Sequence, residues 1–145
     1  MGVRVYPVGR LDYNSEGLLI LTDDGAFTEY MTHPRHEIPK IYHVRTKGDL
    51  TDEELSRLSA PMRIDGREIM PVNCKVIERK HTSTVIEMTL FEGRNRQIRK
   101  MCEQVGLTIR SLKRVAIGNI TLADLGVGKW RLLTAAQVKY LMGKK

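Results

Sequence analysis

The sequence has 145 residues, of which 41% are hydrophobic and 28% charged, a composition typical of one globular domain with a real core. It holds no apolar run as long as a membrane span and no N-terminal signal-peptide pattern, so we expect a soluble, cytoplasmic protein without membrane contacts. Cys74 and Cys102 lie far apart with no CxxC pair, which argues against a disulfide framework or a zinc ribbon and predicts two free, buried thiols.

The net charge of +7 is concentrated in one segment. Residues 92–114 contain seven basic and two acidic side chains, a balance of +5, whereas the remaining 122 residues carry only +2. Concentrated basic charge is typical of a site for a polyanion, because neutralising phosphate groups releases their counterions. The segment therefore predicts either a contact with nucleic acid or a solvated basic face without a ligand.

The N-terminal part of the chain begins with a predicted strand over residues 3–8, in which the residue character alternates. A turn cluster separates it from a short apolar strand over 17–22, and a helix over 26–32 follows. Asp12 lies between the two strands, where two elements of a core are expected to meet. A carboxylate at such a position must be solvated, paired or used in chemistry.

The middle of the chain predicts a strand, a helix and a hairpin. Residues 40–46 alternate as a strand, and the segment 51–58 opens with the capping-box sequence TDEE, which is typical of a helix start. Two further alternating segments, 68–79 and 84–91, flank a short polar turn and predict a β-hairpin.

The segment EGRNRQIRKMCEQVG predicts a helix that ends at Gly106, because its apolar residues recur at i, i+3, i+4 and i+7. Arg96 and Lys100 face away from this apolar stripe. Arg99 lies at its margin, from where a long side chain can either reach a buried acid or rim the core and form a surface ion pair. The apolar residues of the stripe are Ile98, Met101, Cys102 and Val105.

The last part of the chain predicts two strands within 107–125 and a closing helix over 134–142 that Thr134 caps. Hairpin connections dominate the predicted order of elements. We therefore expect an α+β fold with a mixed, mostly antiparallel sheet and flanking helices. The absence of repeats and linkers predicts one domain over residues 1–145.

Four motifs in this order resemble those of the bacterial pseudouridine synthases that modify ribosomal RNA. They are GRLDYNSEGLLILTDDG, KIYHV, EGRNRQIRKM, and LKRVAIGNITL followed by GKWRLLT, and they span nearly the whole chain. The resemblance implies that Asp12 is the catalytic aspartate, that Tyr42 packs against the target base and that Arg99 pairs with the aspartate. It also implies that Leu112 lines the uracil pocket and that Arg10 holds the catalytic loop or the RNA.

The reaction implied by the resemblance is the isomerisation of uridine to pseudouridine, which needs no cofactor and no metal. The carboxylate either attacks the base or the sugar as a nucleophile, or assists loss of the base and removal of a sugar proton. Tyr42 can offer a stacking face to the extruded base or accept its C5 proton. His33 and His36 do not predict a metal site, because Pro34 lies between them and no thiol or carboxylate cluster joins them.

The implied partner is ribosomal RNA or a pre-ribosomal particle, bound by a monomer. Arg94, Arg96 and Lys100 are expected to contact the RNA backbone. The sequence GRNRQIR points to large-subunit RNA. The family also implies a small RNA-binding domain and an opening strand ahead of the first motif, which we expect this chain to lack. The alternative function is an RNA-binding module that keeps the fold without turnover.

Overall fold

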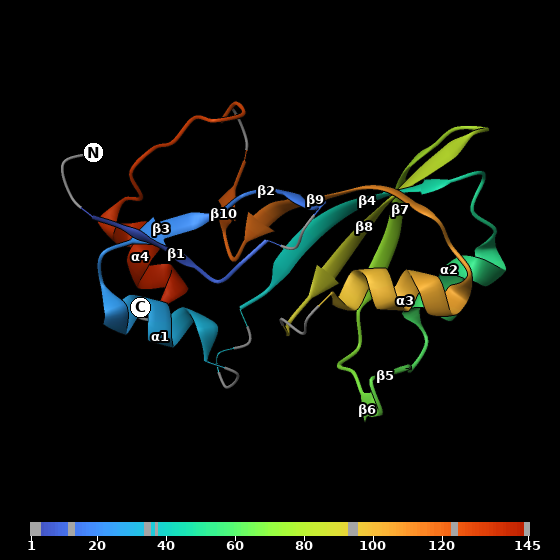
Figure 1. The fold of residues 1–145 in the computed structure, drawn as a ribbon, viewed down its shortest axis with the longest axis horizontal. Helices are drawn as coiled ribbons and strands as arrows, with labels where there is room; N and C mark the ends of the chain where they lie inside the picture. Colours follow the sequence, from blue (N-terminus) through green and yellow to red (C-terminus); the bar gives the residue numbers. More distant parts are fainter. Residues whose placement is uncertain are drawn as a thin grey trace.

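The computed structural model describes residues 4–11, 14–33, 36, 38–92, 96–122 and 125–143, and a six-stranded sheet runs through its centre (Figure 1). The main path of this sheet has the order β10-β9-β4-β8-β7, and β2 pairs with the middle of β9. All pairs are antiparallel except β2 with β9, which is parallel. Its strands are β2 (Glu16–Gly17), β4 (Lys40–Lys47), β7 (Asn73–Arg79), β8 (Ser83–Leu90), β9 (Ile109–Ile117) and β10 (Ile120–Thr121). The predicted α+β class with a mostly antiparallel sheet is confirmed.

A second, smaller layer is formed by the N-terminal segment and the last helix. The strands β1 (Tyr6–Val8) and β3 (Ile20–Thr22) form a two-stranded antiparallel sheet. The helices α1 (Gly25–Thr32) and α4 (Ala135–Leu141) pack beside it, and their apolar residues share one core cluster with Ile117 and Ile120. Both helices begin at side-chain caps: Asp24 accepts from two backbone N–H groups, and Thr134 forms a capping box.

The single strand predicted over 17–22 is wrong, because the chain changes partner in the middle of it. Residues 16 and 17 pair with β9, whereas residues 20–22 pair with β1. At the change, Leu18 donates its N–H to the carbonyl of Arg114 at 2.8 Å, and Gly17 adopts a φ of 122°. Periodicity cannot show this, since the run GLLILT over residues 17–22 contains no turn signal at the point where the partner changes.

Gly17→Ala is expected to lower the free energy of unfolding by about 1–3 kcal/mol, the usual scale of backbone strain at one residue. A Cβ at Gly17 would lie 2.2 Å from the carbonyl oxygen of Arg114, and its φ is one that L-residues rarely adopt. Gly25→Ala is the matched control, because its Cβ meets open space at an ordinary φ. Equal urea midpoints for the two variants would contradict the expectation.

The other layer of the fold is made by two helices that cover one face of the main sheet (Figure 1). The helix α2 (Asp52–Ser59) begins at the predicted capping box, and α3 (Gln97–Val105) ends at Gly106 in the left-handed region. The predicted apolar stripe of α3 is buried against the sheet, in a cluster that includes Val44, Ile86 and Leu112. This packing holds α3 in a fixed position over the sheet.

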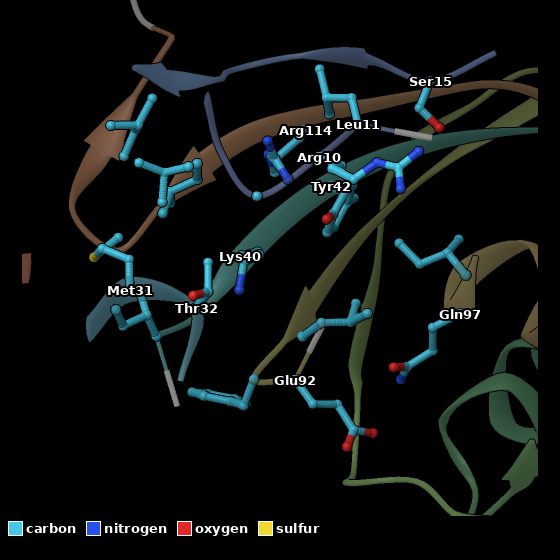
Figure 2. Close-up of a pocket in the computed structure, with 18 of the residues that line it drawn as sticks. Arg10, Leu11, Ser15, Met31, Thr32, Lys40, Tyr42, Glu92, Gln97 and Arg114 are labelled. Atoms are coloured by element: carbon cyan, nitrogen blue, oxygen red, sulfur yellow. The ribbon is translucent and has the colours of Figure 1, made fainter. Parts of the chain in front are cut away.

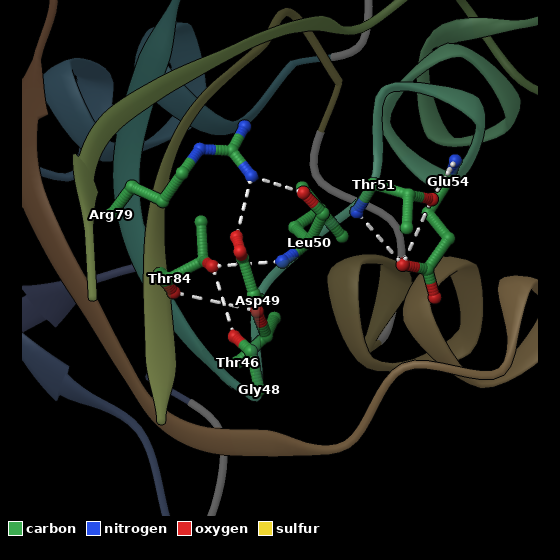
Figure 3. A network of polar contacts seen from close by, with 8 residues as sticks. All are labelled: Thr46, Gly48, Asp49, Leu50, Thr51, Glu54, Arg79 and Thr84. Carbon is green, nitrogen blue, oxygen red and sulfur yellow. Dashed lines mark hydrogen bonds and ion pairs between the residues drawn. The ribbon is translucent and has the colours of Figure 1, made fainter. Parts of the chain in front are cut away.

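Buried threonines fix the connection from β4 to α2 (Figure 3). Thr84 Oγ1 donates to the carbonyl of Gly48 and accepts from the N–H of Leu50, both at 3.0 Å. Thr46 Oγ1 donates to the carbonyl of Thr84 at 3.3 Å. Because these hydroxyls are fully buried, each hydrogen bond replaces one lost to water and specifies this turn.

The strand predicted over 68–79 is shorter than expected. It begins only at Asn73, because the chain before it forms a separate hairpin of β5 (Arg63–Ile64) and β6 (Arg67–Glu68). Asp65 and Gly66, at the turn, have φ values of 54° and 78°. An Asp-Gly pair is a known signal for such a two-residue turn, and it could have revealed the hairpin.

The two cysteines are free, as predicted. Cys102 is fully buried on the core-facing side of α3, and burial raises the pKa of its thiol to about 12. Cys74 is only half-buried, and burial also raises the pKa of this thiol. No helix within the described ranges is long and apolar enough to cross a membrane.

Candidate active site

A cleft of about 810 Å³ opens over the main sheet, between the N-terminal elements β1 and α1 and the start of α3 (Figure 2). Its walls come from the end of β1 and the loop that follows it, from the end of α1, and from the start of α3. Its floor comes from β4, β8 and β9. Segments from most of the chain therefore converge on this one hollow.

One face of the main sheet forms the floor of the cleft. Tyr42 in β4 and Arg114 in β9 are cross-strand partners, and both line the cleft. Lys40 and Leu112 lie two residues from them on the same strands, and they line it as well. Successive side chains of a strand point to opposite faces, so residues two apart share one face. The floor has an apolar part at Leu112 and a cationic part at Lys40 and Arg114.

Arg99 reaches from α3 across the cleft to the N-terminal loop. Its Nη2 donates to the carbonyl of Asn14 at 2.8 Å and to Ser15 Oγ at 3.4 Å. Its Nε is buried and has no hydrogen-bond partner in the parts of the chain that the structure describes. Arg99 therefore lines the cleft and holds the turn that comes directly after residues 12 and 13. Asp12 itself lies outside the described residues, so its pairing with Arg99 stays a prediction.

The structure brings four of the predicted site residues to the cleft. Arg10, Tyr42, Arg99 and Leu112 come from the first loop, β4, α3 and β9, and all of them line it. Leu112 is only 4% exposed and also belongs to the main core. Arg10 is exposed at the cleft rim. Residues that are far apart in the sequence thus share one site.

Two of the three residues predicted to contact the RNA backbone, Arg96 and Lys100, do not line the cleft. Arg96 is exposed and stands just ahead of α3 with a φ of 52°, and Lys100 forms an ion pair of 2.6 Å with Asp65. Neither is among the described residues that line the cleft. Arg94 lies outside the described residues. The side chain of Lys100 is partly exposed, and its contact with the RNA backbone stays a prediction.

Two cleft residues, Lys40 and Arg114, were missed as site residues. Arg114 was counted only within the basic segment, but its side chain is 4% exposed. Its Nε donates to the carbonyl of Leu18 at 2.9 Å, and its Nη2 is buried without a partner in the described part of the chain. Burial and the neighbouring Arg114 lower the pKa of the Lys40 amine. A signal for both was present in the sequence. In a strand, residues two apart share one face, so Lys40 lies on the face of Tyr42, and Arg114 on the face of Leu112.

One of the two histidines that line the cleft, His36, stacks on the ring of Tyr30. The rings of Tyr30 and His36 lie 3.6 Å apart and nearly parallel, and His36 Nδ1 donates to the carbonyl of Tyr30 at 2.7 Å. His33 and His36 also line the cleft. Over the described ranges, no three His, Cys, Asp or Glu side chains form a group that could hold a metal ion.

Comparison with known proteins identifies the family. The model of the RNA pseudouridylate synthase family matches residues 2–104. The ribosomal large subunit pseudouridine synthase B of Bacillus subtilis is 39% identical over 140 residues, which cover 95% of this chain and 57% of that protein. The ribosomal large subunit pseudouridine synthase E of Xanthomonas campestris is 40% identical over 151 residues, covering 94% of this chain and 81% of that protein. An uncharacterized RNA pseudouridine synthase of Aquifex aeolicus is 38% identical, and 55% of its length is matched.

Solved structures agree with the sequence comparison. A crystal structure of a pseudouridylate synthase superposes with a TM-score of 0.85 at 26% identity, covering 94% of this chain and 59% of that one. The human RNA pseudouridylate synthase domain containing 1 shares the fold alone, with a TM-score of 0.60 at 13% identity. The chain spans little more than half the length of the Aquifex and Bacillus relatives. From its sequence and its fold, the chain belongs to the RNA pseudouridylate synthase family.

Proposed function

We propose that the protein converts uridine in ribosomal RNA to pseudouridine, and that residues 1–145 are its catalytic domain. The observation that carries the proposal is the cleft, where Tyr42, Arg99 and Leu112 meet in a chain of this family. These are three of the residues to which the motifs assign roles in catalysis and base binding. They come from separate motifs, and no single motif would have placed them together.

The reaction requires a base to be detached, turned and attached again. The bond from ribose C1′ to uracil N1 breaks, a bond from C1′ to C5 forms, the C5 proton leaves and N1 gains a proton. Nothing is oxidised or hydrolysed, so the groups required are an ionised carboxylate, a proton acceptor and a cavity that holds the detached base. The cleft volume of about 810 Å³ is sufficient for one nucleotide.

Asp12 is the proposed source of the carboxylate. In the sequence it stands between Leu11, which lines the cleft, and Asn14, whose carbonyl Arg99 binds. A guanidinium beside a carboxylate favours its ionised form and fixes its orientation. Both mechanistic alternatives, nucleophilic attack and assisted loss of the base, require this ionised form.

Tyr42 is the proposed partner of the target base. Its ring lines the cleft while part of it packs against the main core, so the ring is held in position by β4. The target base must leave the RNA stack to react, and an aromatic face compensates part of the lost stacking energy. Leu112 supplies an apolar contact on the neighbouring strand.

Large-subunit ribosomal RNA is the proposed substrate. The sequence GRNRQIR favours it, and the relatives from Bacillus and Xanthomonas are named as large-subunit synthases. The test is release of tritium from ribosomal RNA labelled at uridine C5, with large-subunit and small-subunit RNA assayed separately. Release from the large-subunit RNA supports the proposal. Tight binding without release would instead identify an RNA-binding module.

Neutralising Arg96, just ahead of α3, together with Lys100 of α3 is expected to weaken binding to all RNAs alike. In Arg96→Gln/Lys100→Gln, each lost phosphate contact should reduce the slope of log affinity against log salt by roughly 0.7–0.9. The rate at saturating RNA should change little, because these contacts position the RNA without touching the reacting base. Lys139→Gln, an exposed lysine in α4, is the control. A slope equal to that of the parent would show that this face of α3 does not contact RNA.

A further inference from the structure

We propose that Lys40 and Arg114 form a phosphate-binding subsite on the floor of the cleft, which holds a phosphate group of the nucleotide whose base lies at Tyr42. The inference rests on the proposed function, since it places a nucleotide in this cleft. It goes beyond that function by assigning a binding role to one buried and one half-buried cation, to which the resemblance assigned none.

The first support is their position on the sheet. Arg114 is the cross-strand partner of Tyr42, and Lys40 lies two residues before Tyr42 on β4. All three line the cleft, and Figure 2 shows Lys40 and Arg114 on the same side of Tyr42. A step of two residues along a strand covers roughly 6.6 Å, which is comparable with the span from a base to the phosphate of the same nucleotide.

The second support is that Arg114 is buried and Lys40 half-buried, and that neither forms an ion pair with another described residue. Arg114 is 4% exposed, and its Nη2 has no hydrogen-bond partner within the described residues. None of the ion pairs formed in the described part of the chain includes Lys40 or Arg114. Removing a cation from water is costly unless an anion or several acceptors replace the water. The lowered pKa of the Lys40 amine has burial as its first cause and Arg114 as its second, which agrees with two cations held close together.

The third support is the charge of the whole cleft. Its described lining contains one carboxylate, Glu92, whose Oε1 accepts from the N–H of Met70 at 2.9 Å. The basic side chains in the same lining are Arg10, Lys40, Arg67, Arg99 and Arg114. An excess of cations in a partly enclosed cleft attracts anions and strengthens each charge-assisted hydrogen bond. The Arg114 guanidinium and the Lys40 amine both line the cleft and offer donors for the oxygens of one phosphate, and the guanidinium is well suited to phosphate geometry.

The roles of the two residues differ. The Nε of Arg114 is already committed to the carbonyl of Leu18, and its own carbonyl accepts from the N–H of Leu18. Arg114 is therefore fixed in place and presents its remaining donor group as a rigid element of the floor. Lys40 is attached by a flexible stem, so it can adjust to the phosphate. Substitution of Lys40 is accordingly the cleaner test, because Arg114 also stabilises the connection between β2 and β3.

The experiment compares uridine, uridine 5′-monophosphate and uridine 3′-monophosphate as ligands of the 145-residue chain, by NMR titration of backbone amides. The parent is expected to bind at least one of the nucleotides more tightly than uridine. Lys40→Gln is expected to reduce that advantage by roughly tenfold, the usual scale of one charge-assisted hydrogen bond. Binding of uridine itself should change little.

Two further variants make the outcome decisive. Lys75→Gln removes an exposed lysine on β7 that is not part of the cleft lining, and it should keep the full advantage of the nucleotides. Arg114→Lys keeps the charge but loses the guanidinium, and it should lower the advantage while its amide spectrum shows a folded protein. The subsite is overturned if neither nucleotide binds better than uridine, or if Lys40→Gln keeps the preference of the parent. Because these titrations involve no turnover, they are independent of tritium release, which tests the isomerase activity.

Discussion

Asp12→Asn is expected to reduce pseudouridine formation by at least about 10³-fold, the scale on which a lost nucleophile or general base lowers a rate. The amide keeps nearly the shape of the carboxylate, but it neither attacks carbon nor removes a proton. Folding and RNA binding should persist, since the cations of the cleft and of α3 are unchanged. The measurement is tritium release from C5-labelled ribosomal RNA, with RNA binding determined on the same preparation.

Asp23→Asn is the matched control for this result. Asp23 is an exposed acid in the same motif and stands just before the cap of α1. Its substitution removes the same charge from the chain without touching the cleft, so turnover should stay near that of the parent. Turnover by Asp12→Asn above the level of trace contamination would contradict the assignment of Asp12. A matching loss in Asp23→Asn would show that the effect follows net charge.

The helices of the fold could be predicted because their sequence signals are local. The apolar spacing of α3 defines a buried stripe, and Gly106 ends the helix with a φ of 92° that favours glycine. The capping boxes at Thr51 and Thr134 likewise involve residues only three apart in the sequence. Such features need no knowledge of the tertiary fold, and the structure contains all of them.

The failures concern places where a distant segment decides the local structure. Gly17 marks the change of partner only because Arg114 of β9 accepts from the N–H of Leu18 there. The burial of Arg114 depends on the same contact, and a count of charges along the sequence places it with the exposed cations around it. Likewise, Asp65 neutralises Lys100 across 35 residues, which helical periodicity does not reveal. The first two arise from the pairing of β2 with β9, and the third from the position of α3 beside the turn of the β5–β6 hairpin, so all of them require the topology first.

The residues of the candidate site could be predicted only where the resemblance of a motif assigned a role to them. Strand alternation alone makes Tyr42 an ordinary core tyrosine, and the structure shows that it does pack partly on the core. What distinguishes it is the open cleft above the sheet, which Arg10 and Leu11 of the N-terminal loop and Gln97 of α3 also line (Figure 2). Lys40 and Arg114 lie within two of the motifs, two residues from Tyr42 and Leu112, so the alternation of the strands brings to the site two residues to which the resemblance assigned no role.

Arg99→Met is expected to lower turnover strongly and to move the acidic limb of the pH–rate profile to higher pH. If Arg99 pairs with the catalytic carboxylate, its removal leaves an uncompensated charge, and breaking such a buried pair costs about 3–5 kcal/mol. A carboxylate without its guanidinium takes up a proton at higher pH, so the active ionised form is lost at a pH where the parent still works. The turn at Asn14 and Ser15 would also lose its two hydrogen bonds from Nη2.

Arg99→Lys separates the charge of Arg99 from its geometry. The lysine keeps a positive charge near the carboxylate, so the acidic limb should stay close to that of the parent. Lysine lacks the planar guanidinium, which binds Asn14 and Ser15 through Nη2 and keeps Nε available for a further acceptor. The maximal rate on the plateau of the pH–rate profile should therefore still fall. The measurement is tritium release across the pH range for the parent and both variants. If the pH–rate profile of Arg99→Met has the same acidic limb and the same maximal rate as that of the parent, Arg99 only supports the loop from the rim of the core. This is the alternative that the helical spacing left open.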